Sequence, residues 1–373
     1  MRVAHITPCY YPAFAYGGPT RSVYGLTRAL ATLGADVRVL TTNANGRSTL
    51  DVTNGEMELE PRLRVRYARR AGFESTAPSL LRYLPELVQW ADVVHLLGVY
   101  NFPTIPTIFM CRALNKPLAW SPRGALQRWA GTRRRRLKAS WEAACRAVLS
   151  DRVVIHTTSA SEANQVRERI PARVVVIPNG VDLPIEIRHV SGANIRLLFL
   201  GRLDPIKGLE NLVQACALLK SGNLRFDLTI AGVGEKNYEA SLHELVSQHA
   251  LNERVSFVGA ADESDKVQLF ANADVLVLPS HSENFGIVVL EALAHEVPVI
   301  ASHNTPWADL ERKGCGLYVA NEPHALAGAI QAMAKRDRGA MGEAGRRWVE
   351  EEFGWTAIGR RMLDCYGELL ASH

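Results

Sequence analysis

The sequence predicts an α/β protein made of two Rossmann-like domains, each a doubly wound parallel sheet. Short apolar runs rich in β-branched residues alternate with amphipathic helical patterns along most of the chain, which is typical of parallel sheets covered by helices. A length of 373 residues is long for one domain and sufficient for two, each with its own core.

Composition narrows the class of protein. A content of 47% hydrophobic and 22% charged residues is that of an ordinary globular chain. The six cysteines stand singly without metal-ligand spacing, so we expect reduced thiols and a cytoplasmic location. Residues 1–7 do not resemble a signal peptide, and no apolar run is long enough to span a bilayer. Any membrane contact is therefore expected to be peripheral.

Charge is distributed unevenly between the two predicted domains. Residues 1–184 carry 25 Lys and Arg against 13 Asp and Glu, whereas residues 185–373 carry 18 against 25. The net charges of +12 and −7 indicate that the first domain faces an anionic partner, such as a membrane surface, a phosphorylated acceptor or nucleic acid.

The first domain is expected over residues 1–184. Strands are expected at residues 3–8, 37–40, 93–97, 118–120, 153–155 and 174–177, and helices at 20–33, 79–90, 104–114, 129–149 and 159–169. Residues 45–70 show no regular pattern. After the first strand, Gly17 and Gly18 precede a helix, the order of phosphate-binding sites. Since no G-x-G-x-x-G is present, a plain turn explains the two glycines about equally well.

Two basic features of the first domain have both a functional and a structural interpretation. Arg123 follows the strand at 118–120, where open α/β sheets bind ligands, and either contacts a phosphate or acidic acceptor or lies on the surface. The predicted helix at 129–149 places Leu137, Trp141 and Cys145 on one stripe, with a basic cluster mostly off it. That cluster either docks on an anionic membrane or is a solvated face, and it consists of Arg133, Arg134, Arg135, Arg136 and Lys138.

The second domain is expected over residues 185–352, after a polar linker, and a closing helix is expected at 353–373. Strands are expected at 196–200, 226–231, 255–259, 274–278 and 297–301. Arg202 and Lys207 follow the first of these strands and put two cations where a diphosphate can lie. Gly232 and Gly234 form half of a dinucleotide-binding loop, with Asn237 in the place of the third glycine.

Glu283 and Glu291 lie on a strand–loop–helix unit that ends the series of motifs. Pro279 stops the strand at 274–278, and helical spacing begins after Gly286, so the first N–H groups of that helix suit an anion or hydroxyls. The two carboxylates should lie about 8 Å apart, too far to share a proton but suited to two separate hydroxylated groups. The alternative is one glutamate placed by the helix dipole and one on a solvated face. The apolar neighbours of Glu291 and the Asn284-Phe285-Gly286 approach argue against it.

The segment E-N-F-G-I-V-V-L-E-A-L-A and the pattern G-R-L-x-x-x-K-G together resemble the retaining nucleotide-sugar glycosyltransferases of the GT-B fold. These form a large bacterial family, family 4-like, that builds surface glycans. The resemblance implies that Glu283 contacts the donor sugar, that Glu291 holds the ribose hydroxyls, and that Arg202 and Lys207 act on the departing diphosphate. It also implies a donor site that includes Asn284, Phe285, Gly286, Ile287, Gly17, Gly18, Gly232 and Gly234. The resemblance further implies that the closing helix at 353–373 packs back on the first domain. Relatives often carry a histidine where this chain has Arg123.

The resulting hypothesis is a retaining hexosyltransferase in cell-surface polysaccharide biosynthesis, with two domains facing each other across a cleft. Its expected partners are a nucleotide sugar, a glycan or lipid-diphosphate-linked acceptor and the cytoplasmic face of the membrane. Because no DxD-type pair follows an apolar strand, we expect no metal and no cofactor. The alternatives are a nucleotide-sugar epimerase and a non-catalytic glycan-binding or nucleic-acid-binding module. Few base-stacking aromatics interleave with the basic cluster, so nucleic acid is not an expected partner.

Overall fold

The computed structural model describes residues 1–372 except 54, 73–74, 127–134, 188–191 and 223. The chain divides into two compact units, of which unit 1 comprises Met1–Gly180 with Trp355–His373 and unit 2 comprises Val181–Gly354. The sequence placed these boundaries after residues 184 and 352. In the structure the chain leaves unit 1 before the polar linker and returns to it at Trp355.

Unit 1 is built on an eight-stranded sheet in the order β10-β9-β8-β7-β1-β2-β6-β5. Neighbouring strands run parallel except for β5, which is antiparallel to β6. The strands of this sheet are β1 (Arg2–Ile6), β2 (Asp36–Thr42), β5 (Glu56–Glu60), β6 (Leu63–Ala68), β7 (Val93–Leu97), β8 (Leu118–Ser121), β9 (Val153–Thr157) and β10 (Arg173–Val176). A separate hairpin pairs β3 (Ala44–Asn45) with β4 (Ser48–Thr49).

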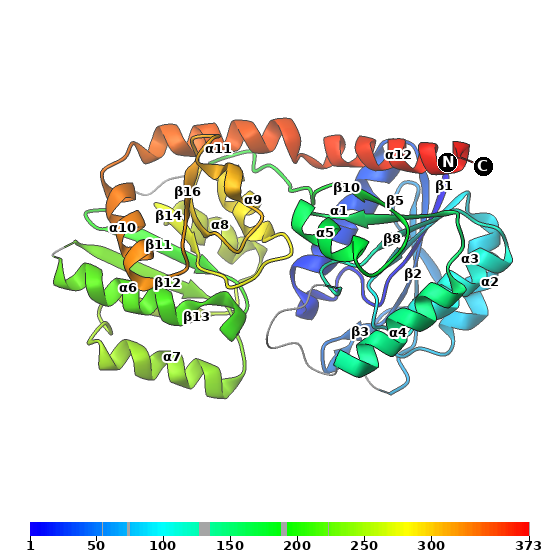
Figure 1. The fold of residues 1–373 in the computed structure, drawn as a ribbon, viewed down its shortest axis with the longest axis horizontal. Helices are drawn as coiled ribbons and strands as arrows, with labels where there is room; N and C mark the ends of the chain where they lie inside the picture. Colours follow the sequence, from blue (N-terminus) through cyan, green and yellow to red (C-terminus); the bar gives the residue numbers. More distant parts are fainter. Residues whose placement is uncertain (54, 73–74, 127–134, 188–191, 223, 373) are drawn as a thin grey trace. The chain divides into compact units, whose positions relative to one another are not determined.

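Helices cover both faces of this sheet. They are η1 (Phe14–Tyr16), α1 (Gly18–Thr32), α2 (Leu80–Trp90), α3 (Thr104–Ala113), α4 (Arg135–Val148), α5 (Ala160–Arg167) and α12 (Trp355–Ala371). Successive strand residues point to opposite faces. Ala4 belongs to the core layer that contains buried residues of α2, α3, α4 and α5, whereas Val3 belongs to the layer that contains those of α1 and α12. Figure 1 shows α12, in red, beside α1.

Two glycines explain how the closing helix joins unit 1. The indole of Trp355 lies so close to Gly25 and Gly180 that a methyl group at either position would overlap it. Gly25 is buried within α1, and Gly180 is the last residue of unit 1 before the chain enters unit 2. Trp355, the first residue of α12, therefore packs directly on the backbone of Gly25 and of Gly180.

Residues 45–70, in which no regular pattern predicts an element, contain the strands β5 and β6 of the sheet. In β6 the residues Leu63, Val65 and Tyr67 are buried and alternate with arginines, which is the period of a strand. The guanidinium of Arg66 lies 4.4 Å from the centre of the Tyr83 ring, so its charged group is held on the other face of the sheet. Because arginines alternate with the apolar residues, β6 lacks the continuous apolar run that marks a parallel strand such as β7.

Unit 2 is built on a six-stranded parallel sheet in the order β13-β12-β11-β14-β15-β16. Its strands are β11 (Ile195–Leu200), β12 (Phe226–Ala231), β13 (Val255–Gly259), β14 (Val275–Leu278), β15 (Val299–Ser302) and β16 (Gly316–Val319). Its helices are η2 (Pro205–Lys207), α6 (Leu209–Ser221), α7 (Lys236–Gln248), α8 (Glu263–Ala271), α9 (Ile287–Ala294), η3 (Ala308–Leu310), α10 (Pro323–Ala334) and α11 (Arg338–Glu352).

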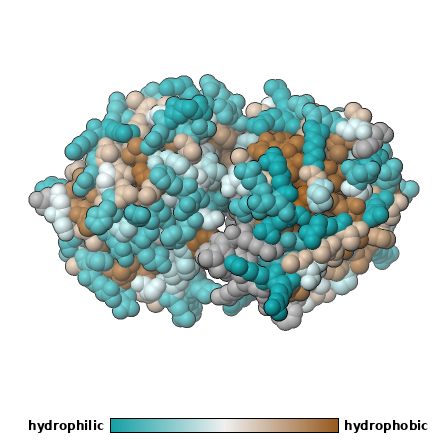
Figure 2. Space-filling view, viewed as in Figure 1, coloured by the Kyte–Doolittle hydropathy of each residue, from teal (hydrophilic) through white to brown (hydrophobic). Residues whose placement is uncertain are grey.

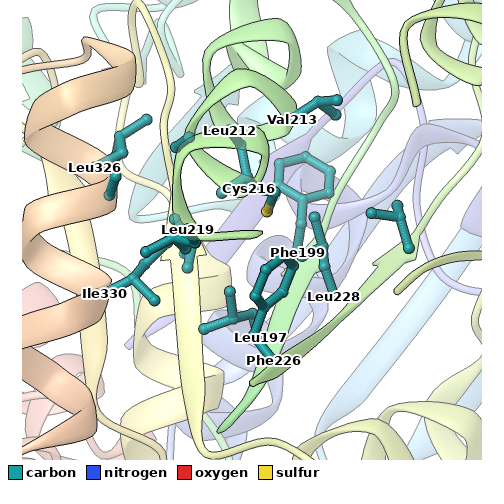
Figure 3. Close-up of a cluster of buried hydrophobic side chains, with 14 of the residues drawn as sticks. Leu197, Phe199, Leu212, Val213, Cys216, Leu219, Phe226, Leu228, Leu326 and Ile330 are labelled. Carbon is teal, nitrogen blue, oxygen red and sulfur yellow. The ribbon is translucent and has the colours of Figure 1, made fainter. Parts of the chain in front are cut away.

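The core of unit 2 also has two layers. Phe199 and Phe226 lie among the side chains that join the sheet to α6 and α10, as Figure 3 shows. The opposite layer contains the buried face of α9, packed with α11. Strand order reverses direction between β11 and β14, and ligands of open α/β sheets bind outside the carboxyl ends of the strands at such a point.

No helix within the described part of the chain combines the length with the hydropathy that crossing a bilayer requires. Figure 2 shows hydrophilic residues over much of the face in view, with hydrophobic patches between them.

Candidate active site

Two loops that leave the sheet of unit 2 on either side of its switch point bring Lys207 and Glu283 together. Lys207 ends η2, after β11, and Glu283 lies in the loop after β14. Lys207 Nζ donates a hydrogen bond to Glu283 Oε1, and the two side chains are only 18% and 10% exposed. An ammonium group and a carboxylate thus meet where the topology predicts a ligand.

The backbone around this ion pair is closely fitted. Gly208 has φ +64°, and a methyl group there would overlap the carbonyl oxygen of Pro279. The His281 N–H donates to Ile206 O over 2.8 Å, which ties the loop after β14 to η2. Glycine is therefore required at position 208 both for its backbone conformation and for this approach.

Ser280 completes the surroundings of Glu283. Its hydroxyl donates to Glu283 Oε1 over 2.9 Å, so the same oxygen accepts from both Ser280 and Lys207. The Ser280 carbonyl in turn accepts from Ser302 Oγ at the end of β15. Two groups therefore hold the carboxylate directly, and Ser302 holds it indirectly through the backbone of Ser280.

Arg202 differs from Lys207 in its surroundings. Its side chain is 70% exposed, and Nη2 lies 3.5 Å from Asp204 Oδ2. The Asp204 side chain also accepts from the Ile206 N–H, so it caps η2. The structure thus brings Lys207 against Glu283 and leaves the guanidinium of Arg202 in solvent on the same loop.

Glu291 lies inside α9 and is paired with a lysine that the sequence did not single out. Lys266 Nζ, from α8, donates to Glu291 Oε1 over 2.5 Å, with side chains 14% and 15% exposed. The pairing residues are 25 positions apart. No local sequence pattern connects the two residues, so the sequence does not predict a role for Lys266.

The Asn284-Phe285-Gly286 approach has a packing role. The Phe285 ring is buried against Trp307 with ring centres 5.2 Å apart, and the Phe285 carbonyl accepts from the Trp307 indole N–H. Gly286 has φ +77° and precedes α9 without a capping side chain. A methyl group at Gly286 would lie 3.2 Å from Leu278. Asn284 and Ile287 are partly exposed beside it.

Gly232 and Gly234 have a structural explanation. A methyl group at Gly232 would overlap the carbonyl oxygen of Gly201, and one at Gly234 would overlap that of Leu203. The Leu203 N–H donates to the Val233 carbonyl over 3.0 Å. The loop after β12 therefore lies directly against the loop that carries Arg202, which requires glycine whether or not a nucleotide binds.

In unit 1, Gly17 and Gly18 stand at the start of α1. Gly17 has φ +67° and serves as the N-cap, and Gly18 is the first helical residue. A methyl group at Gly17 would meet no atom of the described residues within 4 Å. Only its backbone conformation requires glycine there, and the space beside it is open.

Arg123 is held inside unit 1. Nη1 donates to the Asn179 side chain, and burial lowers the pKa of the guanidinium to about 10 although Glu162 opposes that shift. Glu162 is fully buried and accepts from the backbone N–H groups of Gly124 and Thr158. The interpretation of Arg123 as an unconstrained surface arginine is therefore wrong.

A row of buried polar side chains crosses the sheet of unit 1 on the face that α12 covers. Tyr366 Oη, His95, Ser121 and His156 form consecutive hydrogen bonds of 2.5 to 2.6 Å, and His156 Nε2 donates to the Ile177 carbonyl over 2.8 Å. Because that carbonyl only accepts, each neutral imidazole passes on one proton donor, and Tyr366 begins the series. Burial lowers the pKa of His95 and His156, so both remain neutral.

The basic cluster is described only in part, since Arg133 and Arg134 lie outside the described residues. Arg135 and Arg136 are exposed on α4, and Lys138 Nζ lies 4.9 Å from the centre of the Tyr100 ring. Leu137 is 62% exposed, so its placement on the buried stripe was wrong. Trp141 is partly buried and donates its indole N–H to the Val99 carbonyl, which makes it a packing residue.

Within the described ranges, no three His, Cys, Asp or Glu side chains are grouped as a metal site would require. The expectation that the protein uses no metal stays a prediction.

Family models match both parts of the chain. Residues 16–184 match the model described as Glycosyltransferase Family 4, and residues 186–348 match the model described as Glycosyl transferases group 1. The chain is a family 4-like glycosyltransferase with the GT-B fold. This glycosyltransferase is 27% identical to the glycogen synthase of Mycobacterium tuberculosis (strain CDC 1551 / Oshkosh), over 95% of its own length and 92% of the relative.

Solved structures resemble this glycosyltransferase along its whole length. The sucrose-phosphate synthase of Thermosynechococcus elongatus superimposes with a TM-score of 0.78 at 23% identity, covering 100% of both chains. HepE of Anabaena, in a complex with UDP-glucose, superimposes with a TM-score of 0.74 at 18% identity, again over 100% of both. At these identities the likeness establishes the fold, and the predicted GT-B architecture of two parallel-sheet domains is confirmed.

Proposed function

We propose that this protein transfers a hexosyl unit from a nucleotide sugar to a glycan acceptor, with retention of the anomeric configuration of the donor. The observation that carries the proposal is the contact between Lys207 and Glu283 at the switch point of the unit 2 sheet. A carboxylate there suits a sugar hydroxyl, and an ammonium group suits a phosphate. Support for a nucleotide sugar also comes from HepE, whose structure contains UDP-glucose.

In this proposal each charged residue of unit 2 has one role. Glu283 contacts the donor sugar, and Glu291 accepts hydrogen bonds from the ribose. Arg202 and Lys207 stabilise the diphosphate as it departs through an oxocarbenium-like transition state. Lys207 has three N–H donors, so it can serve a phosphate oxygen while it remains bonded to Glu283.

The glycine loops and the start of α9 supply the remaining donor contacts. The backbone at Gly286 and Ile287 presents N–H groups to the donor, beside the Asn284 side chain. Gly17 and Gly18 of unit 1 are also proposed to contact the donor, since the described residues leave the space beside Gly17 open. Gly232 and Gly234 act indirectly, by seating the Arg202 loop. Arg123, held by Asn179, contacts an acidic group of the acceptor.

Metal independence is part of the proposal. Arg202 and Lys207 place two positive charges where a divalent ion would otherwise neutralise the diphosphate. EDTA is therefore expected to leave turnover unchanged. Loss of activity on chelation, restored by Mg²⁺ or Mn²⁺, would contradict this part.

The acceptor is proposed to be a lipid-diphosphate-linked glycan of surface polysaccharide synthesis, met at the cytoplasmic face of the membrane. Arg135, Arg136 and Leu137 support this because all three are exposed in the first turn of α4, in the basic unit 1. Each cation near an anionic surface contributes about 1 kcal/mol. Replacing Arg135 and Arg136 by Ser is expected to weaken binding to phosphatidylserine liposomes at low salt, whereas the exposed pair Arg312→Ser/Arg347→Ser in unit 2 should leave it unchanged. If the Arg135→Ser/Arg136→Ser variant binds liposomes as strongly as the control variant, the basic cluster is a solvated face without a docking role.

The decisive experiment combines a panel of nucleotide sugars with two variants. A donor that raises the melting temperature is first identified, since binding stabilises the folded state by mass action. Glu283→Ala is expected to abolish transfer, whereas Glu291→Ala mainly raises the KM for the donor. Turnover by Glu283→Ala at the wild-type rate would refute the assignment.

The same assay separates the alternatives. Conversion of the donor to a second nucleotide sugar without acceptor would indicate an epimerase. Glycan binding without turnover of any donor would indicate a non-catalytic module.

A further inference from the structure

The ribose-facing carboxylate of the proposed site is held by a lysine on a neighbouring helix. Lys266 Nζ contacts Glu291 Oε1 at 2.5 Å and Glu263 Oε1 at 3.6 Å. Lys266 and Glu291 are about 85% buried, so little water competes for their contact. This lysine belongs to none of the motifs on which the proposed function depends.

An aromatic contact beside the ion pair also joins helices α8 and α9. Asp262 and Asp265 form a reciprocal capping box that starts α8. Phe270, near the end of α8, is buried and stacks on His295, with ring centres 4.7 Å apart. His295 Nδ1 lies 2.8 Å from the Glu291 carbonyl oxygen, one turn from the end of α9. The ion pair and the aromatic contact therefore both connect α8 to the end of α9.

The ion pair uses one carboxylate oxygen of Glu291, Oε1, and orients the other, Oε2. An ionised carboxylate offers two oxygens with about four acceptor positions, and Lys266 uses one of them on Oε1. A carboxylate this buried is costly without a partner charge. Lys266 therefore offsets the cost of burying the Glu291 charge and favours the side-chain rotamer that presents Oε2.

We propose that Lys266 is a positioning residue that orients Glu291 to accept hydrogen bonds from the 2′- and 3′-hydroxyls of the nucleotide, and so sets the preference for ribose over 2′-deoxyribose. The inference rests on the proposed function, in which Glu291 holds the ribose. Lys266 acts through Glu291, because its ammonium group is engaged by the carboxylates of Glu291 and Glu263.

The test compares ribonucleotides with their 2′-deoxy forms on the full chain. Calorimetry measures the Kd of UDP and 2′-deoxy-UDP, and of the corresponding ADP and GDP pairs, and the pair whose ribo form binds the wild type most tightly is used. A hydrogen bond to a charged group should give the wild type a preference of at least about tenfold for the ribo form. Lys266→Met is expected to reduce that preference to about twofold. Lys266→Arg, which can still hold the carboxylate, should preserve most of it.

A matched control shows whether losing any ion pair has the same effect. Lys313 pairs with Glu352 at 2.6 Å elsewhere in unit 2, and Lys313→Met should leave the ratio of the two Kd values unchanged. Because the ratio is taken on one protein, a general loss of stability cancels from it. Lys266→Gln, milder than Lys266→Met, serves as a second variant and should give an intermediate ratio.

Each outcome decides the proposal. An unchanged ratio in Lys266→Met and Lys266→Gln would overturn it. Tighter binding of the ribonucleotide to Lys266→Met would also overturn it, since Lys266 would then compete with the ribose. If no nucleoside diphosphate binds the wild type, the proposed function fails and this inference with it, which is distinct from a wild type that binds without dependence on Lys266.

Discussion

Lys207 and Glu283 are expected to depend strongly on each other in their contributions to the stability of unit 2 and to activity. The two side chains are 18% and 10% exposed. Two unit charges in contact attract by roughly 4 kcal/mol at an effective dielectric constant of about 20. Removing one partner of such a pair typically costs about 3 kcal/mol, because it leaves the other charge buried and unpaired.

A double-mutant cycle measures this coupling. Lys207→Met and Glu283→Gln are each expected to lower the free energy of opening of unit 2 by about 2–3 kcal/mol. The double variant should lose much less than their sum, since neither charge is then left alone, and a coupling energy of about 3 kcal/mol follows. Gln is chosen because its amide oxygen can still accept from Ser280. All three variants should be inactive.

The readout must report on unit 2, because a chain of two units need not unfold in one step. Amide hydrogen exchange in β11 and β14, which carry the two loops, gives the free energy of opening for that part of the chain. The pair Lys313 and Glu352 provides the control, because the Glu352 side chain is 49% exposed and a coupling below about 1 kcal/mol is expected. An equally small coupling for Lys207 and Glu283 would refute the reasoning.

Two further predictions concern the backbone and pH. Gly208→Ala is expected to lower the free energy of unfolding by at least about 2 kcal/mol and to lower turnover, because Gly208 has a positive φ and the added methyl group would overlap Pro279. Gly328→Ala is the control, because α10 leaves open space there among the described residues. This substitution should raise the free energy of chemical unfolding by about 0.5–1 kcal/mol. Burial lowers the pKa of His5 and His156 to about 3, below the unfolded value of about 6.5. The unfolded chain therefore takes up protons that the folded chain does not, and stability should fall as pH falls from about 6.5 toward 3. His5→Leu should reduce this slope by about 1.4 kcal/mol per pH unit, and an unchanged slope across about pH 5 to 7 would contradict it.

Much of the fold was predictable because hydrophobic periodicity is local. Strands such as β7 and β14 are buried on both faces and appear in the sequence as continuous apolar runs. By contrast, β6 alternates apolar residues with arginines, and its arginines are accommodated only because tertiary partners such as Tyr83 lie beside it. Leu137 fitted the helical period but faces outward, since α4 buries a stripe that begins one turn later.

The candidate site was predictable where one segment carries its own signal. Lys207 is next to Gly208, and Glu283 and Glu291 lie on either side of Gly286, which has a positive φ. Each charged residue is therefore close in sequence to a glycine that the backbone requires. Lys266 has no such signal, because its role depends on how α8 packs against α9. Gly232 and Gly234 show the reverse case, in which a glycine pattern typical of nucleotide loops is fully required by backbone packing.

The polar row of unit 1 gives a physical reason why the end of the chain belongs to the domain that contains its start. Along the row each donor is used once, and the first donor is the hydroxyl of Tyr366 on α12. Without α12, the Nδ1 atom of His95 would lose its only partner among the described residues, and an unpaired buried acceptor costs about 1–3 kcal/mol. Apolar burial of Ile358 and Met362 on the same helix acts in the same direction. Apolar periodicity predicts that α12 must be covered. The hydrogen bond to His95, together with the contacts of Trp355 with Gly25 and Gly180, specifies that it covers the sheet of unit 1.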